Sequence, residues 1–179
     1  IVKSVFFISN MPTQSTLTGA TGTYFVLFQL LRRNWIAALA PEGVPNTDII
    51  VTDIEGNRQC AIQVKTRSIG SDKGWHMSKK HEDIISPTLF YCFVDMQIEE
   101  GSLPITFIVP SSVVAAVLNE SHKLWLDRPG SKGQAHNDNK MRRLLPDYLR
   151  KHDYSSDIVS RLGSGWMSKY QENWDILHM

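Results

Sequence analysis

"DIIVTDIEGNRQCAIQVK", residues 48–65, has the pattern of a β-hairpin whose polar side chains gather at the end opposite the turn. IIVT forms one arm, QCAIQVKT forms the other, and EGN has the composition of a turn. Two of three plausible turns place Asp48 opposite Gln63 or opposite Lys65, whereas a three-residue loop places it opposite Val64. Because directly opposed residues share one face of a sheet, the first two registers bring Asp48, Gln63 and Lys65 together.

These three side chains are suited to metal-assisted hydrolysis of a phosphodiester. A carboxylate beside an amide carbonyl offers oxygen ligands to a hard cation such as Mg²⁺. A lysine next to that ion can hold a water or stabilise charge that grows on a phosphoryl oxygen. The alternative is a solvated hairpin end, at which Asp48 ends a turn and Lys65 extends into water.

The segments around the hairpin predict one mixed α/β domain. Apolar residues at spacings of three and four indicate a helix first, and short apolar runs bounded by turn residues indicate strands. Residues 75–84 form an amphipathic or irregular piece. The resulting order of elements favours a small mixed sheet with flanking helices. The expected elements are a helix at 18–35, strands at 35–40, 49–52, 59–66, 89–95 and 105–110, and a helix at 113–120 capped by Ser111 or Ser112.

The character of the chain changes from Ser121 onward. A long polar loop, DRPGSKGQAHNDN, is followed by two or three predicted helices, near 138–150, 155–162 and 165–177. Their apolar faces are too sparse for a separate core. We therefore predict a core domain at residues 1–120 and a C-terminal helical extension at 121–179 that packs on it.

With its helix, strand and acid-bearing hairpin in this order, the stretch from about residue 18 to 110 resembles the PD-(D/E)xK nuclease superfamily. "PNTDIIV" and "AIQVKT" are similar to the core motif of that superfamily. The resemblance implies a restriction-endonuclease-like mixed sheet, Mg²⁺ or Mn²⁺ as cofactor, DNA as partner, and a homodimer. It also implies that Asp48 and the carbonyl of Val64 are metal ligands and that Lys65 is the motif lysine. Gln63 stands where most members have Glu or Asp, although certain homing endonucleases use Gln.

The sequence departs from the superfamily pattern on the first helix. Relatives of the Holliday-junction-resolvase type carry a Glu where this chain has Thr23, which can hold a water but supplies no charge. Asp48 is then the one formal negative charge of the site, unless Glu42 on the preceding loop reaches it. Two hypotheses follow: a Mg²⁺-dependent DNA nuclease, or the same fold without its chemistry, serving as a nucleic-acid or protein binding module. An unrelated α/β interaction protein would place Asp48 far from Lys65.

A basic segment, SDKGWHMSKKHE, follows the hairpin. Its lysines are suited to contact phosphates while an aromatic ring stacks on a base. Alternatively, the segment is a charged amphipathic surface whose Trp and Met belong to the core, and for Met77 and His81 we prefer a core role. The candidate nucleic-acid contacts are Arg67, Lys73, Trp75, His76, Lys79 and Lys80.

Composition excludes several other classes. The 179 residues carry a formal charge of +1, and no apolar stretch approaches the roughly 18 residues of a membrane span. No zinc-like Cys/His spacing, phosphate-binding glycine loop or Ser-His-Asp order is present. Cys60 and Cys92 lie in apolar runs and are expected to be free thiols, which suits a cytoplasmic protein.

Overall fold

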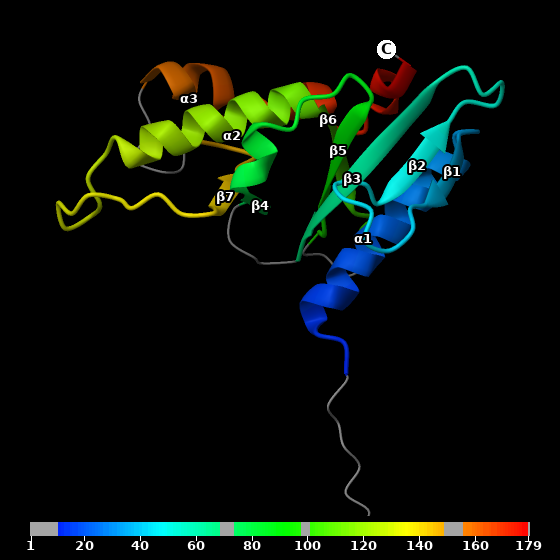
Figure 1. The fold of residues 1–179 in the computed structure, drawn as a ribbon, viewed down its shortest axis with the longest axis horizontal. Helices are drawn as coiled ribbons and strands as arrows, with labels where there is room; N and C mark the ends of the chain where they lie inside the picture. Colours follow the sequence, from blue (N-terminus) through cyan, green and yellow to red (C-terminus); the bar gives the residue numbers. More distant parts are fainter. Residues whose placement is uncertain (1–10, 69–73, 98–100, 149–155, 179) are drawn as a thin grey trace, which may run out of the picture.

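A five-stranded mixed sheet forms the centre of the molecule (Figure 1). The computed structural model describes residues 11–68, 74–97, 101–148 and 156–178. The strands β1 (Ile36–Leu39), β2 (Ile49–Thr52) and β3 (Gln59–Arg67) are antiparallel neighbours, β3 runs parallel to β5 (Leu89–Asp95), and β6 (Ile105–Pro110) is antiparallel to β5. The predicted fold class, a mixed sheet flanked by helices, is therefore confirmed. In spatial order the strands are β1, β2, β3, β5 and β6.

Helix α1 (Gln14–Leu31) covers one face of the sheet (Figure 1). It begins four residues earlier than predicted, because the Thr13 side chain caps it by accepting from the backbone N–H of Thr16. Its glycines therefore lie inside the helix. Gly22 has a structural reason to be there, since a Cβ at this position would collide with the side chain of Thr66 on β3.

The opposite face of the sheet packs against a second layer. Its strands β4 (Trp75–Ser78) and β7 (Met141–Leu144) pair antiparallel, and the 3₁₀ helix η1 (Lys79–Glu82) follows β4 directly. The segment from residue 75 is thus a strand and a 3₁₀ turn. The prediction of a helix near 138–150 is wrong for Met141–Leu144, whose buried side chains alternate as in a strand and which has β4 as its partner.

Helix α2 (Ser111–Leu126) runs along the two-stranded sheet. The predicted serine cap is wrong, because the N-cap residue is Pro110. The Ser111 hydroxyl instead binds the backbone of Ser86, donating to its carbonyl at 2.8 Å and accepting from its N–H at 2.9 Å. The domain boundary predicted at residue 120 falls inside α2, and β4 and β7, from the two predicted parts, share one sheet.

The C-terminal segment closes against β6 on the α1 side. Helix α3 (Ser156–Leu162) lies where it was predicted, but the last predicted helix is instead a pair of 3₁₀ turns, η2 (Ser168–Tyr170) and η3 (Trp174–His178). Between these turns, Glu172 accepts hydrogen bonds from the backbone N–H and the hydroxyl of Thr106 at 2.8 and 2.7 Å. Among the described residues, no helix combines the length and the apolar character needed to cross a bilayer.

Candidate active site

The hairpin register brings the predicted acid and amide face to face. Strands β2 and β3 pair Ile49 with Ile62, and the backbone N–H of Asp48 donates to the Ile62 carbonyl at 2.9 Å. One further step along this register sets Asp48 opposite Gln63, which is the first of the predicted registers. Lys65, two residues beyond Gln63, lies on the same face of the sheet.

The Asp48 carboxylate is fixed at the point where β2 begins. Its Oδ2 accepts a hydrogen bond from the backbone N–H of Val64 at 2.6 Å. In an antiparallel pair the N–H and C=O of one residue point to the same neighbour, so the Val64 carbonyl faces the same side as Asp48. Because a carboxylate has about four lone-pair sites, this bond leaves Asp48 capacity for another ligand.

Gln63 supplies a buried oxygen that lacks a partner. The residue is 8% exposed, and its Oε1 accepts no hydrogen bond from the described part of the chain. Leaving a buried polar atom unpaired costs about 1–3 kcal/mol of folding free energy. A water or a cation bound to this oxygen would offset that cost. Three oxygen donors, from Asp48, Gln63 and the Val64 carbonyl, are the ligand type that a hard divalent ion prefers.

The site carries little negative charge. In the described parts of the chain, no three His, Cys, Asp or Glu side chains converge as a metal cluster would require. Asp48 thus contributes one carboxylate, and the other nearby oxygens of Gln63 and Val64 are neutral carbonyl groups; such a set of donors would suit a hard cation but hold it weakly.

Lys65 is partly shielded from water, and charges of both signs lie near it. Burial lowers the pKa of its ammonium below the ordinary value, the Asp48 carboxylate opposes that change, and the Lys80 cation adds to it. A lysine with a lowered pKa beside a carboxylate is a recurrent feature of functional sites.

Two residues that sequence patterns did not mark as functional, His81 and Tyr91, complete this face. Tyr91 is the register partner of Gln63 on β5, and its hydroxyl lies 2.8 Å from Nδ1 of His81. Burial lowers the pKa of His81 to about 4, and the cations of Lys65 and Lys80 contribute. His81 is therefore neutral near pH 7. No local pattern could have revealed Tyr91, because its place follows from the pairing of β3 with β5.

Two of the candidate nucleic-acid contacts, Trp75 and Arg67, are engaged by other residues of the protein. Trp75 is 1% exposed, and its indole N–H donates to the Val94 carbonyl at 3.0 Å. The prediction that Trp75 stacks on a base is wrong, and its alternative, a core role, holds. Arg67 forms an ion pair with Asp95, and its guanidinium lies 4.4 Å from the centre of the Trp75 ring.

The other basic candidates differ in how freely their side chains could contact a nucleic acid. Lys80 and His76 are exposed, and Lys80 is close enough to Lys65 to affect its pKa. Lys79 is also exposed, but its ammonium is bound to Asp138 at 2.8 Å. Lys73 lies outside the described residues. Lys80 is therefore the candidate cation that borders the site.

The two accessory candidates are Thr23 on α1 and Glu42 on the loop before β2. The Thr23 hydroxyl donates to the Gly19 carbonyl of its own helix at 3.1 Å. Glu42 is exposed on the loop between β1 and β2. Among the described residues, no hydrogen bond or ion pair joins either of them to Asp48.

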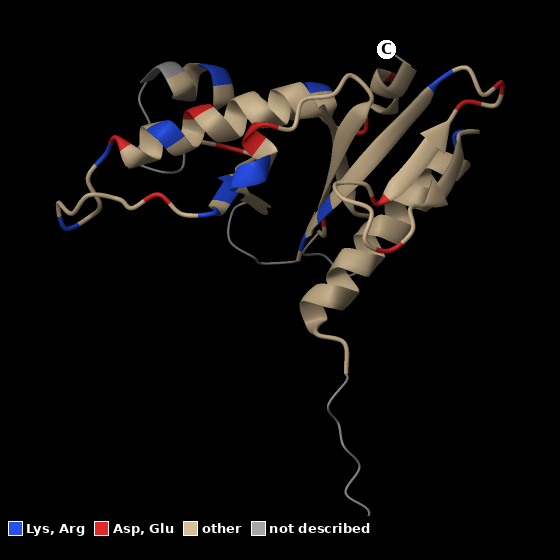
Figure 2. Cartoon of the chain, in the orientation of Figure 1, with Lys and Arg blue, Asp and Glu red and all other residues tan. Residues whose placement is uncertain are grey.

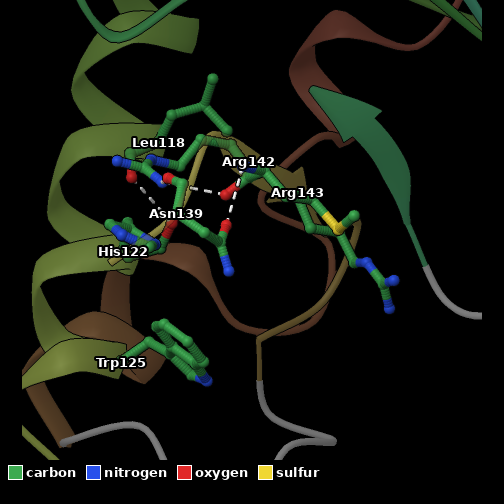
Figure 3. Close-up of a pocket in the computed structure, with 8 residues that line it drawn as sticks. Leu118, His122, Trp125, Asn139, Arg142 and Arg143 are labelled. Atoms are coloured by element: carbon green, nitrogen blue, oxygen red, sulfur yellow. Dashed lines mark hydrogen bonds between the residues drawn. The ribbon is translucent and has the colours of Figure 1, made fainter. Parts of the chain in front are cut away.

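A separate cavity of about 270 Å³ lies between α2 and β7. Leu118, His122 and Trp125 from α2 line it, together with Asn139, Arg142 and Arg143 (Figure 3). All five N–H groups of the buried Arg142 are engaged, by the carboxylates of Glu82 and Asp138 and by the carbonyls of Asn139 and Met141. Through its bonds to Glu82, this arginine links β7 to η1, and none of its N–H groups is left to bind a ligand.

Comparison with solved structures returns nucleases. A bacterial homing endonuclease, I-Ssp6803I, is 13% identical, covers 93% of this chain and 92% of its own, and has a TM-score of 0.49. Hjc, a Holliday junction resolvase from the archaeal hyperthermophile Archaeoglobus fulgidus, is 14% identical, covers 71% of this chain and 83% of its own, and has a TM-score of 0.41. No protein-family model matches the sequence, and the search of curated proteins gives no match.

Homing endonucleases and Holliday junction resolvases are also the kinds of nuclease with which the sequence was compared above. At these TM-scores the likeness carries no argument about function. The function proposed below is therefore inferred from the geometry around Asp48, Gln63 and Lys65.

Proposed function

We propose that this chain is a divalent-cation-dependent nuclease that hydrolyses phosphodiester bonds in DNA. The observation that carries the proposal is the buried, unpaired Oε1 of Gln63, a residue that lies opposite Asp48 in the hairpin and two residues from the partly buried Lys65. A hairpin end that served only the fold would gain stability from an apolar residue at position 63, because the unpaired oxygen costs free energy.

In this proposal, Asp48, Gln63 and the Val64 carbonyl hold Mg²⁺ or Mn²⁺. The bound ion would polarise a phosphoryl oxygen and make a coordinated water more acidic. Lys65 holds the attacking water or donates to the phosphoryl oxygen as charge grows there. The hydrogen bond from Val64 N–H keeps the Asp48 carboxylate in place. His81 is neutral and adds no third cation beside Lys65 and Lys80.

DNA is the proposed partner because cations border this face. Lys80 lies near Lys65, and exposed His76 and Lys79 lie on the same β4–η1 segment. Cationic side chains next to a hydrolytic site can bind the phosphates of the substrate strand and set its register. The proposed assembly is a homodimer.

The second candidate function is a binding module that has the nuclease fold without its chemistry. One observation favours it: Asp48 is the single acidic residue among the proposed ligands, with Gln63 neutral and Thr23 bound to its own helix. Such a module would bind DNA and leave it intact.

Metal titration tests the proposed site without relying on activity. Gln63→Glu replaces an amide by a carboxylate of nearly the same shape, so Mn²⁺ affinity measured by calorimetry should tighten at least tenfold. Asp48→Asn should nearly abolish binding. Gln59→Glu is the matched control, because it adds the same charge on the same face of β3 but about 13 Å away.

A melting series gives a second measure of the same binding. With Mn²⁺ at 100 times the dissociation constant of the Gln63→Glu variant, binding stabilises the variant by about 2.7 kcal/mol. The parent, which binds tenfold more weakly, gains about 1.4 kcal/mol. The difference corresponds to roughly 3–5 °C in Tm for a domain of this size. If Gln63→Glu binds Mn²⁺ no better than Gln59→Glu does, position 63 does not face an ion.

Cleavage assays separate the two candidate functions. Lys65→Ala should lower the rate of Mn²⁺-dependent cleavage by on the order of 100-fold, while affinity for a DNA duplex changes little. Absence of cleavage by the parent, together with DNA binding, would favour the binding module. Equal cleavage by the parent and Lys65→Ala would place the activity elsewhere.

A further inference from the structure

Helix α1 has no charged residue along its whole length. Its 18 residues, QSTLTGATGTYFVLFQLL, contain no Asp, Glu, Lys or Arg, and the neighbouring strands β1 and β2 also contain none. Figure 2 shows this flank as an uncharged block, in contrast to the charges along α2. A helix that covers a sheet normally carries charged residues on the side that faces water. The outer side of α1 therefore differs from an ordinary solvated surface.

Four large apolar side chains form a continuous stripe on that outer side. Leu17, Tyr24, Phe28 and Leu31 are each 50% to 60% exposed. At 3.6 residues per turn they fall within an arc of about 60°, and the stripe is about 21 Å long. The buried residues of α1 lie on the opposite side, against the sheet. The stripe thus points away from the core of this chain.

We propose that this α1 stripe is the interface with a second copy of the chain. In a two-fold interface, residues near the axis meet their own copies, so a charged residue there would face a like charge. The stripe contains no charge. Tyr24 lies midway between Leu17 and Leu31, so an antiparallel pair of helices centred on Tyr24 packs Leu17 of one copy against Leu31 of the other. DNA is a poor occupant, because the stripe offers no cation to its phosphates.

The stripe supplies a substantial part of the area that such an interface needs. An aromatic side chain buries about 150–250 Å², so half-exposed Tyr24 and Phe28 each offer on the order of 100 Å². Together with the two leucines, the stripe supplies about half of the ~800 Å² per partner that a stable interface buries. The exposed Leu39 of β1, the neighbouring edge strand, lies on the face of the sheet that α1 covers and extends the apolar surface. Arg32, whose guanidinium lies 5.7 Å from the centre of the Phe28 ring, marks the charged end of the stripe.

Charge exchange at Tyr24 tests the interface on the full chain. Sedimentation velocity should show a dimer for the parent and monomers for Tyr24→Glu and Tyr24→Lys. An equimolar mixture of the two variants should restore the dimer, because the opposite charges then meet across the axis. Ile85→Glu is the matched control: Ile85 is an exposed apolar residue beside α2, and its replacement should leave the dimer intact.

The mixing step also guards against misfolding, because two misfolded variants would not regain the parent dimer when mixed. A parent that remains monomeric up to near-millimolar concentration would overturn the proposal. Dimers of Tyr24→Glu alone, or a mixture that stays monomeric, would overturn it as well. None of these outcomes depends on nuclease activity.

Discussion

The neutral His81 gives the sharpest physical test of the site. His81 is 3% exposed and forms a hydrogen bond with the Tyr91 hydroxyl, and the cations of Lys65 and Lys80 lie near enough to affect it. Burial lowers the pKa of His81 to about 4, against an ordinary value of 6.5. Acidification should therefore weaken the fold through this residue, because an imidazolium has to form in a buried, positively charged place.

The size of the effect follows from linkage. The pKa is lower in the folded chain than in the unfolded chain, so the unfolded chain binds more protons between pH 6.5 and about 4. The stability that neutral His81 contributes is complete above pH 6.5 and is lost as the pH falls through this window. One pKa unit corresponds to 1.36 kcal/mol, so the loss between pH 7 and pH 4 is about 3 kcal/mol.

Urea unfolding from pH 7 to pH 4 measures this loss when the parent is compared with His81→Gln. Other titrating groups act in both proteins and cancel in the difference. The free energy of unfolding of the parent should fall by about 3 kcal/mol more than that of the variant. His76→Gln, at an exposed position, is the control and should follow the parent.

Titration of the His81 imidazole by NMR tests whether its lowered pKa causes this loss of stability. The His81 signal should titrate near pH 4, and Lys80→Ala should raise the His81 pKa because it removes a neighbouring cation. A His81 pKa near 6.5 in the parent would refute this reasoning. It would mean that His81 is not buried beside Lys65 and Lys80.

Two further predictions concern packing and DNA binding. Gly22→Ala should cost about 1–3 kcal/mol in urea unfolding, because the added Cβ collides with Thr66, whereas Gly19→Ala in the same helix meets nothing and should stabilise the fold by up to about 1 kcal/mol. Equal effects of the two substitutions would contradict the close packing of α1 on β3. In fluorescence anisotropy with duplex DNA, Lys80→Ala should reduce the slope of log affinity against log salt by about one unit. Lys79→Ala should reduce it less, because Asp138 already binds that ammonium; an equal reduction would mean that this ion pair opens when DNA binds.

Local sequence determined the part of the candidate site that lies on one hairpin. The turn at residues 55–57 and the alternation of side chains along β3 limit the register to a few choices, and the observed choice sets Asp48 opposite Gln63. The bounds of β5 and β6 were also predictable, because apolar runs between turn residues mark strand ends. In these segments the deciding interactions join residues that are close in sequence.

Tertiary structure decided the rest, because the deciding contacts join distant segments. Tyr91 reaches the site through the parallel pairing of β5 with β3, and His81 through the packing of η1 on that face. Met141–Leu144 is a strand because β4 offers it a partner, against the helix that local composition favours. The apolar positions of α1 are readable from sequence, but only the packed sheet separates those that it buries from the four that it leaves in water. Only one face of a helix can pack on a sheet. In α1 it is the face that carries Gly22, because Thr66 of β3 packs directly against this glycine.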